Sequence, residues 1–130
     1  MKKIISTKNA PTPIGPYSQG VLLGNILYTS GQIAMNPKTG ELNIKNINEE
    51  THQVMKNLKS VLNAVEMTFD NVIKTSIFIS DMNNFNEINE VYGEYFSSNF
   101  PARETVEVSC LPKNVNIEIP QGKTVAIVGE

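Results

Sequence analysis

Two residues of opposite charge that could act on a small organic acid lie within one stretch of the chain, Pro101 to Ile119. Arg103 carries a guanidinium, which binds a carboxylate through two parallel hydrogen bonds, and Glu118 carries a carboxylate that could accept a proton from water. Polar and apolar residues alternate on both sides of a turn signal at 111–114. The stretch therefore predicts a β-hairpin with Arg103 and Glu118 on one polar face.

Each candidate residue also has a simpler interpretation. Arg103 and Glu118 could form an exposed salt bridge that contributes little to stability. Cys110 falls on the apolar side of its strand, so we expect a core residue rather than a nucleophile, because a reactive thiol needs an exposed, electropositive setting. Tyr17 ends a proline-rich loop and could either present its phenol to a ligand or pack against the core. Asn89 lies inside a predicted helix, where its amide could face solvent or make a tertiary hydrogen bond.

The predicted elements that would position these residues follow the order strand, strand, strand, helix, strand, helix, strand, strand. After a short extended start, their ranges are 19–23 and 26–30 for strands, 47–67 for a helix, 70–80 for a strand, 85–96 for a helix, and 103–110 and 115–119 for strands. Asn46 and Glu49 fit a capping box at the start of the first helix. The pattern predicts one α+β domain over residues 1–130, with two helices packed on one face of a mostly antiparallel sheet of about six strands.

Composition and charge restrict the function classes that the chain can serve. It has 130 residues, and its formal net charge of −2, without a cluster of lysine or arginine, offers no footprint for the phosphate backbone of nucleic acids. No apolar run reaches the length of a signal-peptide core or of a membrane-spanning segment. A single cysteine and a single histidine exclude an internal disulfide and leave little for a metal site, so we expect a cytoplasmic protein without bound metal.

Short motifs are spread in order along nearly the whole chain, from about Thr7 to Ile119. They are Ile14-Gly15-Pro16-Tyr17-Ser18-Gln19, Thr29-Ser30-Gly31-Gln32, Asn36-Pro37-Lys38-Thr39-Gly40, Phe85 with Asn89, Pro101-Ala102-Arg103, Leu111-Pro112-Lys113 and Ile117-Glu118-Ile119. Together these motifs resemble those of the RidA/YjgF family. The resemblance implies a chorismate-mutase-like α+β fold that assembles as a homotrimer, with three sites in clefts between subunits. It also implies hydrolysis of reactive 2-imino acids, such as those that pyridoxal-phosphate dehydratases release, to 2-keto acids and ammonia without metal or cofactor.

The resemblance assigns a role to individual residues by their matching positions. Arg103 would hold the substrate carboxylate, and Glu118 would position or activate the attacking water. The residues that would line the pocket are Tyr17, Ser30, Gly31, Asn89 and, through its backbone, Thr105. Many relatives have a cysteine at the place of Thr105, so any behaviour that depends on a thiol there would be absent from this chain.

The chain departs from the family pattern directly after Glu118. Relatives continue the last strand, whereas Pro120-Gln121-Gly122 interrupts it here before an apolar segment resumes at 123–128. Proline removes a hydrogen-bond donor from a sheet and is tolerated only at an edge or a bulge. The interruption therefore bears on the geometry around Glu118 rather than on Arg103.

Two other functions are compatible with the same residues. A regulatory trimer could bind a small carboxylate without turnover, which would require Arg103 but not Glu118. RNA cleavage and translation inhibition have been attached to members of the family, but the acidic balance of this chain argues against nucleic acid as a partner. Imine hydrolysis is therefore the first expectation.

Overall fold

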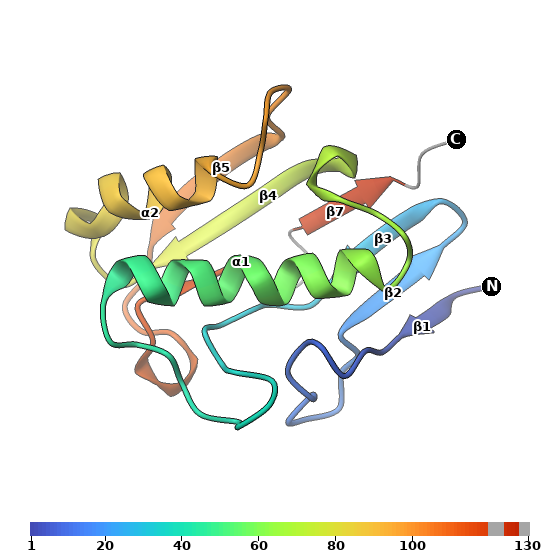
Figure 1. Cartoon of the computed structure of the whole chain (residues 1–130), viewed down its shortest axis with the longest axis horizontal. Coiled ribbons are helices and arrows are strands. Elements are labelled where there is room, and N and C mark those ends of the chain that lie inside the picture. Colours follow the sequence, from blue (N-terminus) through green and yellow to red (C-terminus); the bar gives the residue numbers. More distant parts are fainter. Residues whose placement is uncertain (120–123, 128–130) are drawn as a thin grey trace.

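A computed structural model, which describes residues 1–119 and 124–127, has two layers: a mixed β-sheet and two α-helices that cover one of its faces (Figure 1). The strands are β1 (Lys3–Ile5), β2 (Gly20–Leu23), β3 (Ile26–Thr29), β4 (Val72–Ile79), β5 (Ala102–Glu107), β6 (Ile117–Glu118) and β7 (Thr124–Ile127), and the helices are α1 (Ile47–Asn63) and α2 (Phe85–Gly93). The interruption that we expected at Pro120-Gln121-Gly122 lies outside the described residues.

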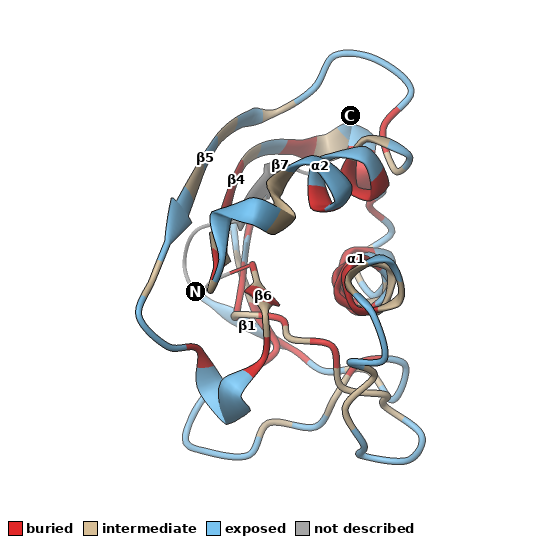
Figure 2. Ribbon diagram, turned by 90° about the vertical axis from the view of Figure 1, so that its left-hand side faces the viewer, coloured by how far each residue is buried: buried red, intermediate tan, exposed pale blue. Residues whose placement is uncertain are grey.

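The strand order β1-β2-β3-β7-β4-β5 places β4 inside the sheet. One edge of β4 pairs in parallel with β5, and the other edge pairs antiparallel with β7 near its start and with β6 near its end. Strand β3 is also antiparallel to β7, so β3 and β4 run in the same direction. Consecutive strands that run in parallel need a long crossover, which α1 supplies between β3 and β4 and α2 supplies between β4 and β5. Figure 2 shows both helices on the same side of the sheet, which confirms the predicted α+β arrangement.

The hairpin predicted for Pro101–Ile119 is wrong, because β5 and β6 pair with the two opposite edges of β4 and not with each other. Arg103 of β5 is the register partner of Thr75. Glu118 of β6 is the register partner of Phe78. Partners in adjacent strands point to the same side of a sheet, and residues three apart in a strand point to opposite sides. Arg103 therefore faces the helices, and Glu118 lies on the other face.

Strand β5 forms an edge of the sheet and is exposed along most of its length, as its pale blue colour in Figure 2 shows. Val106, which points away from the helices, is exposed. Cys110, which we expected in the core, is exposed in the segment that follows β5. The apolar alternation of this strand is real, but it does not face the core of its own chain.

Helix α1 supplies the middle of the core. Its apolar side chains recur at helical spacing and form one buried stripe, since Val54, Leu58, Val61 and Leu62 are fully buried. Val54, Leu58 and Leu62 belong to a cluster that also contains Leu27, Ile77, Ile79, Ile88, Tyr92 and Phe96. Burying one such side chain stabilises the fold by roughly 1.5–3 kcal/mol. No helix in the described part of the chain is both long and apolar enough to cross a membrane.

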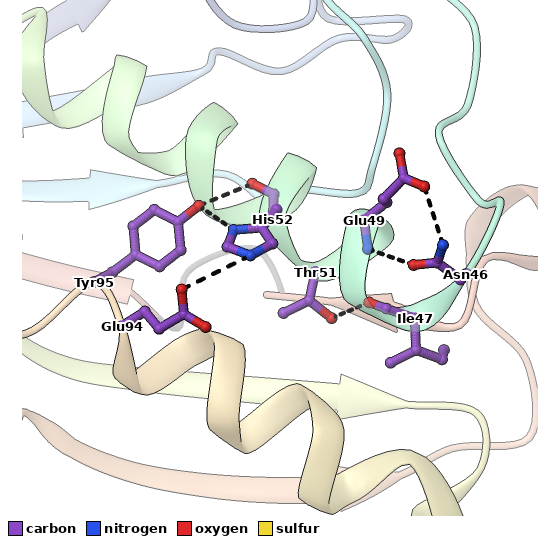
Figure 3. Close-up of polar contacts among 7 residues, drawn as sticks. All are labelled: Asn46, Ile47, Glu49, Thr51, His52, Glu94 and Tyr95. Carbon is purple, nitrogen blue, oxygen red and sulfur yellow. Dashed lines mark hydrogen bonds and ion pairs between the residues drawn. The ribbon is translucent and has the colours of Figure 1, made fainter.

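Polar contacts fix the start of α1 and join it to the end of α2 (Figure 3). The side chain of Asn46 accepts a hydrogen bond from the backbone N of Glu49 at 2.8 Å, which confirms the Asn46 half of the predicted capping box. The Glu49 carboxylate accepts from the side-chain amide of Asn46 at 3.0 Å rather than from its backbone N. Farther along, the hydroxyl of Tyr95 lies 2.7 Å from Nδ1 of His52. Glu94 lies 4.0 Å from Nε2 of the same ring. The two helices are thereby joined by polar contacts as well as by the core.

Replacing Asn46 with alanine should lower the free energy of unfolding by about 1 kcal/mol, because the N–H of Glu49 loses its partner. The measurement is denaturant unfolding at a fixed protein concentration. Asn48→Ala is the matched control, since Asn48 is an exposed asparagine in the same turn, and it should change the free energy by less than about 0.5 kcal/mol. Equal losses in the two variants would contradict the capping role.

Candidate functional site

Two clefts divide the expected site residues between them. One cleft, of about 460 Å³, is lined by Asn89, Tyr92, Gly93, Phe100, Pro101 and Arg103. The other, of about 240 Å³, is lined by Ile14, Tyr17, Ser30, Gly31, Ile33, Pro112 and Glu118. Each cleft therefore holds one of the two charged residues that we expect to act on a substrate. Within residues 1–119 and 124–127, no group of histidine, cysteine, aspartate or glutamate side chains could hold a metal ion.

Arg103 is held against aromatic rings at the first cleft. Its guanidinium carbon lies 5.0 Å from the ring centre of Tyr92 and 5.7 Å from that of Phe85, within the range of cation–π attraction. The hydroxyl of Tyr92 is anchored in turn, 2.6 Å from the hydroxyl of Thr75. Among the described residues no carboxylate forms an ion pair with Arg103, so the simpler interpretation of a salt bridge to Glu118 is wrong. The guanidinium is oriented, and its donors are left for a ligand.

Two more of the expected residues belong to the Arg103 side. Asn89 is exposed on α2 and lines the same cleft. Thr105 lies two residues beyond Arg103 in β5 and therefore faces the same side of the sheet. Its hydroxyl is buried and has no hydrogen-bond partner among the described residues. Because β5 is an edge strand, the backbone groups on its outer side are also open to a ligand or to a second strand.

Glu118 is held from both sides by other segments. Ile119 exchanges two backbone hydrogen bonds with Gln32, at 2.8 and 3.1 Å, which ties the end of β6 to the segment after β3. On the other side, the backbone N of Ile117 donates to the Glu50 carboxylate at 3.3 Å. Glu118 itself is half-buried, and removal from water raises the pKa of its carboxyl. A raised pKa lies nearer to neutral pH, where a carboxyl can both accept and return a proton efficiently.

Gln19 holds the proline-rich loop that ends in Tyr17. Its buried side chain accepts a hydrogen bond from the backbone N of Thr7 at 2.6 Å and donates to the carbonyls of Ala10 and Pro11 at 3.2 and 2.9 Å. Tyr17 is 40% exposed and lines the second cleft. Local sequence patterns did not indicate this role of Gln19, because it depends on backbone groups that lie 8 to 12 residues away along the chain.

Ser30 and Gly31 follow β3 and line the second cleft. The backbone N of Ser30 donates to the carbonyl of Gln19 at 2.9 Å, and its hydroxyl donates to the carbonyl of Ser18. The hydroxyl of Ser30 thus fastens the Tyr17 loop to β3. The second cleft is therefore built from three segments that are fixed to one another by backbone contacts: the loop, the end of β3 and β6.

Comparison with known proteins agrees with this arrangement over almost the whole chain. A family model described as endoribonuclease L-PSP matches residues 7–127. The chain belongs to the RidA/YjgF family. The human 2-iminobutanoate/2-iminopropanoate deaminase is 46% identical over 129 residues, which cover 99% of this chain and 92% of the human protein. A RutC family protein of Pyrococcus horikoshii is 51% identical over 119 residues, which cover 92% of this chain and 94% of that protein.

Solved structures of the RidA/YjgF family have the same fold. The crystal structure of TdcF from Escherichia coli with bound serine matches with a TM-score of 0.91 at 39% identity, over 98% of this chain and 99% of that chain. The membership that the motifs indicated is therefore confirmed, and the α+β architecture is consistent with the chorismate-mutase-like fold that we expected.

Replacing Glu118 with glutamine should raise the melting temperature near neutral pH but not below pH 4.5. The folded-state pKa of Glu118 is raised above its ordinary value of 4.5, so the folded protein binds this proton more tightly than the unfolded chain does. Stability is therefore lost as pH rises from the ordinary pKa through the raised one, and glutamine avoids that loss. The melting temperature is measured by circular dichroism near neutral pH and below pH 4.5. The control is Glu87→Gln, which changes an exposed glutamate. An equal gain at both pH values would contradict the burial of a charged Glu118.

Proposed function

We propose that this chain hydrolyses reactive 2-imino acids to 2-keto acids and ammonia, at sites that two copies of the chain build together in a homotrimer. The observation that carries the proposal is the oriented guanidinium of Arg103, which has no acidic partner in the described chain, together with the half-buried carboxyl of Glu118. Membership of a family with relatives named 2-iminobutanoate/2-iminopropanoate deaminase supports this reaction class.

The reaction needs little machinery, because a protonated imine is already electrophilic at C2. Arg103 holds the substrate carboxylate and so fixes the imine relative to the attacking water. Glu118 accepts a proton from the water while the water oxygen forms a bond to C2 of the substrate. The product of this step is a tetrahedral 2-amino-2-hydroxy acid. The carboxyl then returns that proton to the nitrogen. The C–N bond breaks with its electron pair going to nitrogen, and the hydroxyl proton passes to the departing ammonia, which leaves a keto acid and an ammonium ion.

The proposed assembly brings together Arg103 and Glu118, which the sheet separates within one chain. Arg103 and Glu118 of one chain lie on opposite faces, so a site that uses both takes Arg103 from one copy and Glu118 from another. The face of the sheet away from the helices and the free edge of β5 offer a surface for this contact, because exposed apolar side chains gather there. These are Tyr28 and Val106. We assign the lining of the composite site to Tyr17, Ser30, Gly31, Asn89 and Thr105.

The purified protein should accelerate keto-acid release by a threonine dehydratase when semicarbazide is present to trap the imine. Arg103→Ala should reduce this acceleration by roughly 100-fold, because two charge-assisted hydrogen bonds to the substrate are lost. Lys59→Ala, which removes an exposed cation from α1, is the control and should retain full activity. The proposal fails if the wild type gives no acceleration or if Arg103→Ala is undiminished. Full turnover by Glu118→Gln would contradict the role of Glu118 as the proton acceptor.

Mixing two inactive variants tests whether the site is shared between copies. When Arg103→Ala and Glu118→Gln chains are unfolded together and refolded as a mixture, some contacts combine an intact Arg103 with an intact Glu118 from a different chain. Random assembly at equal amounts should restore about a quarter of the wild-type activity. Each variant refolded alone is the control. Absence of recovery in a mixture that size-exclusion chromatography shows to be assembled would mean that one chain supplies both groups.

A further inference from the structure

A buried carboxylate outside both clefts is bonded to the segment that precedes Glu118. Glu50, in the first turn of α1, is 0% exposed. One of its oxygens accepts hydrogen bonds from the backbone N of Asn116 at 2.7 Å and of Ile117 at 3.3 Å. The other accepts from the side-chain amide of Asn116 at 2.8 Å. Neither cleft is lined by Glu50, and no described lysine, arginine or histidine forms an ion pair with it.

The energetics of Glu50 indicate that it has a task other than packing. A buried carboxylate without a cationic partner is costly unless hydrogen bonds compensate it, and an apolar side chain of similar size often gives equal or greater stability. Here the compensation comes from three N–H donors and from the N-terminal end of α1, where the helix dipole favours negative charge. All three donors belong to Asn116 and Ile117. The hydrogen bonds of the Glu50 carboxylate therefore all go to this one segment, Asn116 and Ile117.

The segment needs such support because β6 is only two residues long, Ile117 and Glu118. Its ladder pairs it only with the end of β4, which leaves the strand few backbone bonds of its own. Ile117 is buried on the helix side of the sheet, where its backbone N contacts Glu50. Because side chains alternate along a strand, fixing Ile117 toward the helices directs Glu118 to the opposite face and into the second cleft.

We propose that Glu50 is a positioning residue for Glu118, whose buried carboxylate clamps the backbone of Asn116 and Ile117 and thereby sets the geometry of the catalytic carboxyl. The clamp itself is independent of the proposed function, and only its consequence for turnover rests on that function. Since Arg103 lies on β5, across β4 from this clamp, loosening the clamp should impair the chemical step and leave binding of the substrate carboxylate intact.

Amide hydrogen exchange tests the clamp without reference to activity. Glu50→Leu keeps the volume of the side chain and removes both acceptor oxygens, so the Ile117 amide should exchange at least about 10-fold faster than in the wild type. Glu50→Gln, which keeps one acceptor oxygen, should give a smaller increase and serves as the test variant if the leucine variant does not fold. Amides in the β4–β5 ladder should be unchanged. Unchanged protection at Ile117 would overturn the inference.

Steady-state kinetics in the imine assay test the consequence. Glu50→Leu should lower kcat by at least about 10-fold with KM within about twofold of the wild type, and Glu50→Gln should recover part of the loss. Asn116→Ala removes one of the three donors to Glu50 and leaves both backbone bonds in place, so it should lower kcat by less than Glu50→Leu does. Leu58→Val, a destabilising change in the core of the same helix, should lower the melting temperature without changing kcat.

The wild type in the same assay separates the two proposals. If it does not accelerate keto-acid release, the proposed function fails, and the exchange rates alone decide whether Glu50 clamps Ile117. If the wild type is active and Glu50→Leu has the same kcat, the positioning role is wrong while the proposed function stands. The positioning role would also be wrong if Leu58→Val lost as much kcat as Glu50→Leu. The loss of kcat would then reflect lower stability of the whole protein.

Discussion

The pairing of β4 with a different strand along each of its edges is the constraint on which the candidate site depends. Thr75 and Phe78 point to opposite faces, and Arg103 and Glu118 follow their register partners. Rotation of a side chain cannot carry it through a hydrogen-bonded sheet. Arg103 and Glu118, which the proposed reaction needs together, therefore stay apart within one chain. The need for a second copy in the proposed site is therefore a consequence of strand register.

Buried polar side chains hold the segments around the second cleft that have little regular structure of their own. Gln19 anchors the proline-rich loop, and Glu50 anchors the start of β6. Asn57 of α1 does the same for the segment after β3, because its amide donates to the carbonyls of Ile33 and Met35 at 3.0 and 2.9 Å. Two of the three anchors lie on α1, so the helix that builds the core also fixes the walls of this cleft.

Local patterns in the sequence were sufficient to predict the helices and most strands, since the stripe of α1 and the cap at Asn46 depend only on near neighbours. They could not predict which strands pair. Alternation in the last stretch is compatible with a hairpin, and only the fold shows that β5 and β6 flank β4, which leaves Cys110 exposed. Family motifs pointed to Arg103 and Glu118, whereas the anchoring roles of Gln19 and Glu50 depend on tertiary contacts that no local pattern records.

Within the described part of the chain, the side chain of Gln19 forms its hydrogen bonds with main-chain atoms of the loop that it anchors. Its hold on the loop therefore does not depend on which side chains the loop carries. Residues at the cleft, such as Ile14 and Tyr17, can be exchanged during evolution while the attachment of the loop persists. Different residues thus hold the loop in place and determine the selectivity of the cleft. Proteins with this fold can therefore differ in ligand preference while they keep the same core.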